Sequence, residues 1–202
     1  MEMKDRGDVR AEVAGEHRSL EQAIARIRTL PADDPGRRVC LKRIAVTLAG
    51  HVVAVEQVLH PAVHSHVPEG DRLARQSLTD LVRAEEVMKD LEFTDTESGE
   101  FDTLLRRLTT WLRRHSDCEE AFLLPHLSGA APRPALDELK DDLHTVEADA
   151  AALREAVAHG RRPDVIDRVH TALTERYHSA SAPDRRPARS PAPDGPEDWP
   201  AL

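Results

Sequence analysis

Apolar residues recur along the chain with the three-to-four-residue spacing of amphipathic helices. In the first four stretches the apolar positions are Val13, Leu20, Ile24 and Ile27; Leu41, Ile44, Leu48, Val55 and Val58; Leu78, Leu81 and Met88; and Leu104, Leu108, Trp111 and Phe122. Two later stretches carry Leu136, Leu139, Leu143, Val146, Leu153 and Val157, then Ile166, Val169, Leu173 and Tyr177. No stretch shows the sustained alternation of a strand. The sequence therefore predicts an all-α protein with six helices.

Internal prolines separate these stretches and are expected to mark the helix boundaries. They are Pro31, Pro35, Pro61, Pro68, Pro125, Pro132, Pro134 and Pro163. Residues 181–202 hold six of the fourteen prolines and few aliphatic residues, so they bury too little apolar surface to offset the entropy of ordering. We expect a disordered Pro-rich tail, and ending the chain near Ala180 should leave helical content and melting temperature almost unchanged.

The net charge of −9 argues against a nucleic-acid partner, because a duplex binder usually presents a basic face to the phosphates. No apolar run approaches the roughly 20 residues of a membrane helix, and the charged N-terminus does not resemble a secretory signal. The only two cysteines, Cys40 and Cys118, lie far apart without a CxxC pattern. These features favour a cytoplasmic protein that binds neither nucleic acid nor membrane.

Three histidines lie on the apolar faces of three different predicted helices. They are His17, His51 and His115, and their imidazoles should point into the core. One inward histidine is usually a hydrogen-bonded core residue, whereas three on three helices indicate a metal or cofactor pocket. Glu119 follows His115 by four residues, which places carboxylate and imidazole side by side on one helix face. Helical bundles that hold metal ions use inward groups of this kind.

A spacing of 34 residues separates His17 from His51 and His144 from His178, and Leu81 precedes His115 by the same interval. The spacing is that of three similar helical hairpins. His144 and His178 fall one residue away from the apolar stripes. We therefore expect both to be flanking or surface residues, whose replacement by alanine leaves any bound metal unchanged.

Two segments, HVVAVEQVLHPA from His51 and HSDCEEAFLLPHL from His115, resemble the signature helices of the hemerythrin HHE cation-binding family. Those helices read His-x-x-x-Glu-Glu with a proline ten residues after the histidine, an offset that Pro61 and Pro125 share. EHRSLEQAIARI, HVPEGDRLA and EEVMKDLE extend the resemblance over about residues 7–128. It implies an up-down four-helix bundle in residues 1–128, to which residues 133–180 add a helical hairpin, packed on or extending the bundle.

Carried over residue by residue, the resemblance implies His17, His51, His115 and Glu119 as ligands of non-heme iron. The chain departs from the family pattern at two places. Val55 stands where the first signature helix has its Glu, and Leu81, with Gln76 nearby, stands where the third helix supplies its His.

Glu56 is a further candidate ligand, although it projects about 100° away from Val55 on an ideal helix. Its alternative role is a solvated flanking residue. Two divalent ions about 4 Å apart repel strongly without anionic bridges. The incomplete ligand set therefore indicates a mononuclear or partial dinuclear iron site, or no metal.

Three functions remain open at this point. The first is a metal-binding protein that binds or senses dioxygen, nitric oxide or peroxide at an incomplete site. The second is a metal-free bundle that serves as a protein-interaction or small-molecule-binding module. The third is an enzyme that uses residual iron or the His115 and Glu119 pair as a general base, and no nucleophile or phosphate-loop motif supports it. The physiological ligand, any protein partner and the oligomeric state stay open.

Overall fold

The computed structural model describes residues 8–158 and 164–180, with side chains described for residues 8–153 and 164–175. The tail expected at 181–202 and the side chain of His178 lie outside the described residues. Within the described part, all regular structure is helical and forms six continuous helices. The prediction of an all-α protein is therefore confirmed.

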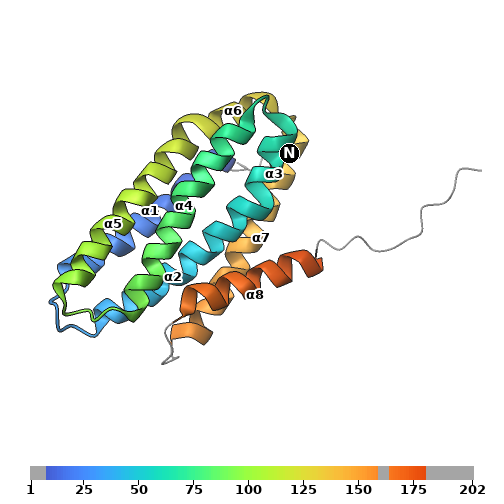
Figure 1. The fold of residues 1–202 in the computed structure, drawn as a ribbon. Coiled ribbons are helices and arrows are strands. Elements are labelled where there is room, and N and C mark those ends of the chain that lie inside the picture. Colours follow the sequence, from blue (N-terminus) through green and yellow to red (C-terminus); the bar gives the residue numbers. More distant parts are fainter. Residues whose placement is uncertain (1–7, 159–163, 181–202) are drawn as a thin grey trace, which may run out of the picture.

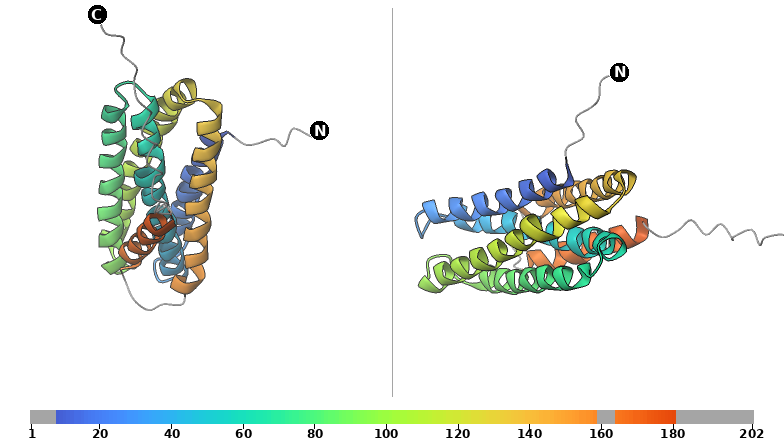
Figure 2. Two further views of the ribbon diagram at one scale, coloured as in Figure 1. Left: turned by 90° about the vertical axis from the view of Figure 1, so that its right-hand side faces the viewer. Right: turned by 90° about the horizontal axis from the view of Figure 1, so that it is seen from above.

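Four long helices run side by side as an up-down bundle (Figure 1, Figure 2). The first is α1 (Val9–Thr29) and the third is α4 (Gly70–Phe93). The second joins α2 (Gly36–Ala54), a π-helical turn η1 (Val55–Leu59) and α3 (His60–His66). The fourth joins α5 (Gly99–Cys118), a π-helical turn η2 (Glu119–Leu123) and α6 (Leu124–Ala130).

Capping residues and one glycine explain where several of these helices begin. The side chains of Asp8 and Ser98 accept hydrogen bonds from the first turns of α1 and α5, which satisfies backbone N–H groups that have no helical partner. At Gly70, the first residue of α4, a Cβ atom would lie 2.7 Å from Val63 Cγ1. The close turn between α3 and α4 therefore needs a residue without a side chain.

Pro61 and Pro125 lie inside the second and fourth long helices and do not end them as expected. A proline has no N–H and its ring clashes with the carbonyl four residues earlier. The turn before each proline is π-helical: the His60 and Leu124 N–H groups each bond to a carbonyl five residues back. This wider turn accommodates the proline and lets the helix continue.

The π-helical turn η2 also changes which residues face the core. Phe122, which the regular spacing placed on the apolar face, is 53% exposed, whereas Leu123 and Leu124 are buried. The prediction for Phe122 was wrong because one additional residue in the turn rotates everything that follows it.

The C-terminal hairpin consists of α7 (Arg133–Ala158) and α8 (Val165–Ala180). Helix α7 packs along α1 and α2, and α8 crosses the bundle obliquely over α2 and α4 (Figure 1). Helix α2 is thus contacted by α1, α4, α7 and α8, and residues 48–55 are all buried. A Cβ atom at Gly50 would lie 2.7 Å from Ala150 Cβ, so α7 sits directly on the turn of α2 that precedes His51.

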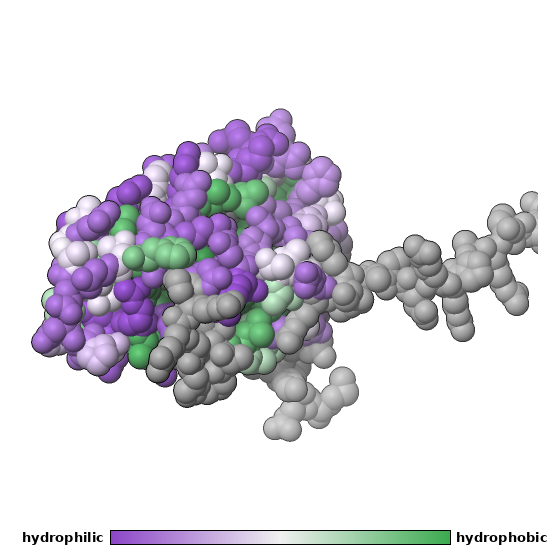
Figure 3. Space-filling model, turned by 60° about the horizontal axis from the view of Figure 1, so that its bottom comes forward, coloured by the Kyte–Doolittle hydropathy of each residue, from purple (hydrophilic) through white to green (hydrophobic). Residues whose placement is uncertain are grey.

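The molecular surface is largely polar. On the face drawn in Figure 3 hydrophilic residues dominate and apolar residues show only as small separate groups. Large apolar side chains exposed within the described residues are Val39, Val82, Phe93 and Phe122. In residues 8–158 and 164–180, no helix combines the length and the apolar character needed to cross a membrane.

A cluster of charges joins α8 to the bundle. His170 Nδ1 lies 3.1 Å from Glu85 Oε1, and His170 Nε2 lies 3.5 Å from Glu56 Oε2. Lys89 Nζ extends the cluster, at 3.6 Å from Glu85 and 2.9 Å from Asp167. The carboxylates of Glu56 and Glu85 raise the pKa of His170 to about 9, although burial opposes them.

This cluster predicts a pH-dependent contribution to stability. Because the pKa of His170 is higher in the folded than in the unfolded chain, the contribution is complete below about pH 6.5 and is lost as the pH rises through about 9. His170→Gln removes the charge and keeps a hydrogen-bonding side chain. The free energies of unfolding of wild type and variant, measured in urea, should differ most near about pH 6 and converge above about pH 10. An equal difference at every pH would contradict this assignment.

Candidate metal centre

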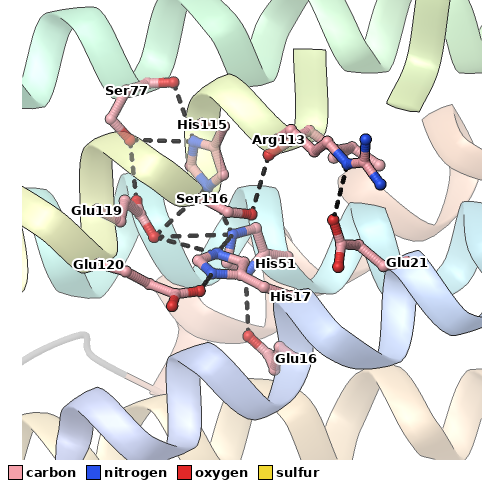
Figure 4. Close-up of polar contacts among 11 residues, drawn as sticks. Glu16, His17, Glu21, His51, Ser77, Arg113, His115, Ser116, Glu119 and Glu120 are labelled. Carbon is pink, nitrogen blue, oxygen red and sulfur yellow. Dashed lines mark hydrogen bonds and ion pairs between the residues drawn. The ribbon is translucent and has the colours of Figure 1, made fainter. Parts of the chain in front are cut away.

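Four side chains from three of the long helices converge in the middle of the bundle (Figure 4). They are His17 of α1, His51 of α2, His115 of α5 and Glu119 of η2. Their exposed fractions are 4%, 1%, 0% and 0% in that order. One nitrogen or oxygen atom of each lies within 4.8 Å of the corresponding atoms of the others. The inward orientation predicted for the three histidines is confirmed, and their role as ligands stays a prediction.

The distances within this cluster are short. His51 Nε2 lies 2.8 Å from His115 Nε2 and 3.3 Å from His17 Nε2. Glu119 Oε2 lies 3.4 Å, 3.5 Å and 4.0 Å from the Nε2 atoms of His17, His115 and His51, respectively. The planes of the three imidazoles cross at 75° to 85°. All three rings therefore present Nε2, and Glu119 presents Oε2, to one small volume.

The Nδ1 atoms of the same rings face outward to hydrogen-bond acceptors. His17 donates to Glu120 at 2.7 Å, His51 donates to Glu16 at 2.9 Å, and His115 donates to the carbonyl oxygen of Ser77 at 3.1 Å. A neutral imidazole that carries its proton on Nδ1 has a lone pair on Nε2. Three lone pairs and a carboxylate oxygen thus point at one another. Metal-binding histidines are oriented by outer partners in this way.

Burial and charge act against each other in the cluster. Burial lowers the pKa of His115 to about 4, so this imidazole is neutral at pH 7. Burial also lowers the pKa of His17, but Glu119 and Glu120 outweigh it and the pKa is raised. For Glu119, burial would raise the pKa, yet the imidazoles of His115, His17 and His51 hold it well below its usual range. The carboxyl group of Glu119 is therefore ionised.

The arrangement fits one divalent metal ion. Glu119 Oε2 is shielded from solvent and has no hydrogen-bond partner in the described chain. A single proton can remove the repulsion between one pair of these lone pairs, whereas a cation at the centre attracts all of them and removes the repulsion throughout the cluster. Ligand atoms about 2.1 Å from a tetrahedral ion are about 3.4 Å apart, close to the separations observed here. Three imidazole nitrogens and one carboxylate oxygen suit iron, manganese or zinc.

Helix α4 contributes Ser77, which the sequence did not single out. Ser77 is fully buried, and its hydroxyl donates to Glu119 Oε1 at 2.9 Å. Leu81, where we expected the missing histidine to have stood, is a fully buried core residue one turn further along. Gln76 is exposed and bonds to Asp80. The residue of α4 that hydrogen-bonds to the cluster is therefore Ser77. It lies four residues before Leu81 and so on the same helix face, which is the feature of the sequence that could have identified it.

Other candidates lie outside the cluster. The carboxylate of Glu56 is paired with His170, and His144 is 73% exposed and paired with Glu12. Cys118 is buried with Sγ 3.9 Å from the carbonyl oxygen of Leu73, and burial raises its pKa, so it is a thiol rather than a thiolate. The structure brings together four of the five predicted ligands and leaves Glu56 apart.

Comparison with protein families agrees with this geometry. The sequence model of the hemerythrin HHE cation-binding domain matches residues 8–127, which is more than half of the chain. The chain belongs to the hemerythrin HHE cation-binding family. No match was found among curated proteins or among solved structures. Helices α7 and α8 lie beyond the matched hemerythrin domain.

The two signature helices of this hemerythrin domain are built alike but are not equally complete. His51 and His115 occupy corresponding places, and Pro61 and Pro125 follow them at the same offset after a π-helical turn. At the position of Glu119, however, the first signature helix carries the buried Val55. The two signature helices therefore offer two corresponding positions for an inward carboxylate, and this chain has a carboxylate, Glu119, at only one of them.

Proposed function

We propose that this hemerythrin-family protein binds a single divalent metal ion, non-heme iron in the first instance, at His17, His51, His115 and Glu119. The observation that supports the proposal is the convergence of three Nε2 lone pairs on a buried carboxylate oxygen that has no hydrogen-bond partner. His17, His51, His115 and Glu119 would hold the ion, and iron bound there would supply affinity for a small ligand by accepting it as a further ligand. The function would then be to bind or sense dioxygen, nitric oxide or peroxide.

The residues of the chain favour one ion over two. A second divalent ion about 4 Å away would be repelled strongly unless anionic groups lie between the two. Glu119 is the one carboxylate in the cluster, because Val55 occupies the corresponding place on the other signature helix. Glu16 and Glu120 hold the rings of His51 and His17 in orientation, and their charge stabilises a cation at the centre.

Metal analysis tests the proposal. Protein made without a histidine tag, loaded with Fe²⁺ and passed through a chelating resin, should retain about one ion per chain. His115→Ala removes a fully buried ligand and should lower the retained iron at least about tenfold. His64→Ala is the matched control, because His64 is exposed and pairs only with Asp71 on the surface among the described contacts. Retained iron should also raise the melting temperature of the wild type and not that of His115→Ala.

The alternative is a metal-free bundle that acts as a protein-interaction or small-molecule-binding module. Val55 supports it, since an apolar residue at a ligand position is what loss of metal binding leaves behind. A folded wild type that retains no ion after loading with iron, manganese and zinc in turn would contradict the metal proposal and favour this alternative.

We also propose that the protein is located in the cytoplasm. Cys40 and Cys118 are both free thiols, which suits a reducing compartment. The net charge of −9 supports the further expectation that nucleic acid is not a partner.

A further inference from the structure

A second cluster of metal-ligating side chains lies between α1 and α7, outside the site described above. Glu12 comes from α1, and His144 and Glu147 come from α7, the helix that follows the matched family domain. One ligand atom of each lies within 4.8 Å of the other two. His144 Nδ1 is 2.7 Å from Glu12 Oε1. All three line a surface pocket of about 430 Å³, to which Glu16 also contributes.

The negative charge in this pocket is only partly compensated. The carboxyl groups of Glu12, Glu16 and Glu147 all line the pocket, and the carboxyl group of Glu147 lies at hydrogen-bond distance from that of Glu16. Glu12 Oε2 is shielded from solvent and has no hydrogen-bond partner in the described chain. The ammonium group of Lys140 lies 4.0 Å from this oxygen, beyond hydrogen-bond distance. A cation among these oxygens would relieve both the repulsion and the unsatisfied atom.

A comparison within the same chain shows what distinguishes this cluster from an ordinary surface pair. His64 and Asp71 form a contact of similar length, 2.8 Å, but both side chains are exposed, at 74% and 52%. Among the described residues, no third ligand joins that pair in a metal-sized group. Glu12, by contrast, is only 14% exposed, and Glu147 provides a third ligand.

We propose that Glu12, His144 and Glu147 form a second divalent-cation site, at the surface, which the C-terminal hairpin completes. One imidazole and two carboxylates suit a first-row ion such as Mn²⁺, with water in the remaining positions. Because the pocket is open to solvent, the ion at this site exchanges with the medium, unlike an ion in the buried cluster.

Glu16 lies between the two sites. Its Oε2 accepts a hydrogen bond from His51 Nδ1, and its carboxyl group lies at hydrogen-bond distance from that of Glu147. The surface site nevertheless shares none of its three ligands with the buried cluster. The two sites can therefore be tested separately.

Titration with Mn²⁺ tests the surface site in the full chain. The protein is first given one equivalent of Zn²⁺ to fill the buried cluster, which Mn²⁺ displaces poorly. Mn²⁺ is then added while electron paramagnetic resonance measures the free ion. About one Mn²⁺ per chain should bind, and both His144→Ala and Glu147→Gln should weaken its binding at least about tenfold.

Three further variants complete the design. His64→Ala should bind Mn²⁺ like the wild type, and Lys140→Gln should bind it more tightly because a competing cation is removed. His115→Ala, titrated without Zn²⁺, should keep the surface ion even though it lacks the buried one, so failure of the proposed function would not be mistaken for failure of this site. Absence of Mn²⁺ binding in the wild type, or unchanged binding in folded His144→Ala and Glu147→Gln, would overturn the proposal.

Discussion

Replacement of Val55 by Glu together with Ser77 by His is expected to give a protein that binds about two iron ions per chain, as complete di-iron bundles do. The first change supplies the carboxylate missing from the first signature helix, at the position that corresponds to Glu119 in the second. The second places an imidazole at the position of α4 whose side chain already hydrogen-bonds to Glu119. In air the double variant should gain a charge-transfer absorption band that the wild type lacks.

Two further variants serve as controls for this result. Val55→Glu alone buries a carboxylate without a full metal complement, which is costly in a core, so its stability should fall and its iron content should stay near one. Val55→Glu with Leu81→His should also bind less iron than Val55→Glu with Ser77→His, because it leaves Ser77 in contact with Glu119. Unchanged iron content in a folded Val55→Glu, Ser77→His protein would show that these positions do not converge on the metal.

Ending the chain at Ala131 is expected to abolish cooperative folding, even though the matched family domain is then complete. Helix α2 is covered on its outer side by α7 and α8, and removing them would expose apolar side chains that are now buried. Each large apolar side chain returned to water costs about 1.5–3 kcal/mol. Three of them would consume much of the roughly 5–15 kcal/mol that stabilises an ordinary domain.

Circular dichroism with thermal melting, together with size-exclusion chromatography, measures this effect. A chain that ends at Ala180 keeps both helices and is the matched control. A chain that ends at Ala131 and still melts cooperatively as a monomer would show that the four-helix bundle is stable without its hairpin.

The all-α class and the inward histidines could be predicted because both follow from helical periodicity, whereas the up-down bundle was implied by the family resemblance. Each of His17, His51 and His115 lies on an apolar stripe, and Glu119 follows from the four-residue interval within one helix. These relations depend on local geometry alone, which a single sequence records.

Features that depend on irregular geometry or on packing could not be predicted in this way. The exposure of Phe122 requires knowledge of the π-helical turn, which the proline signals only indirectly. The contacts of Ser77 and Glu120 with the cluster depend on how α4 and η2 meet the other helices. The pair formed by Glu12 and His144 joins residues 132 positions apart, so no local pattern contains it.

The outer partners of the three imidazoles differ in their access to water, and this difference sets the rates at which protons exchange. Glu120 is 44% exposed and opens the Nδ1 of His17 to solvent, whereas Glu16 is 16% exposed and shields the Nδ1 of His51 more closely. Ser77 and His115 are both fully buried. A ring proton on His115 can leave only when the bundle opens locally, while one on His17 has a short path outward. In hydrogen exchange, the Nδ1 proton of His17 should therefore exchange with solvent fast and that of His115 slowly.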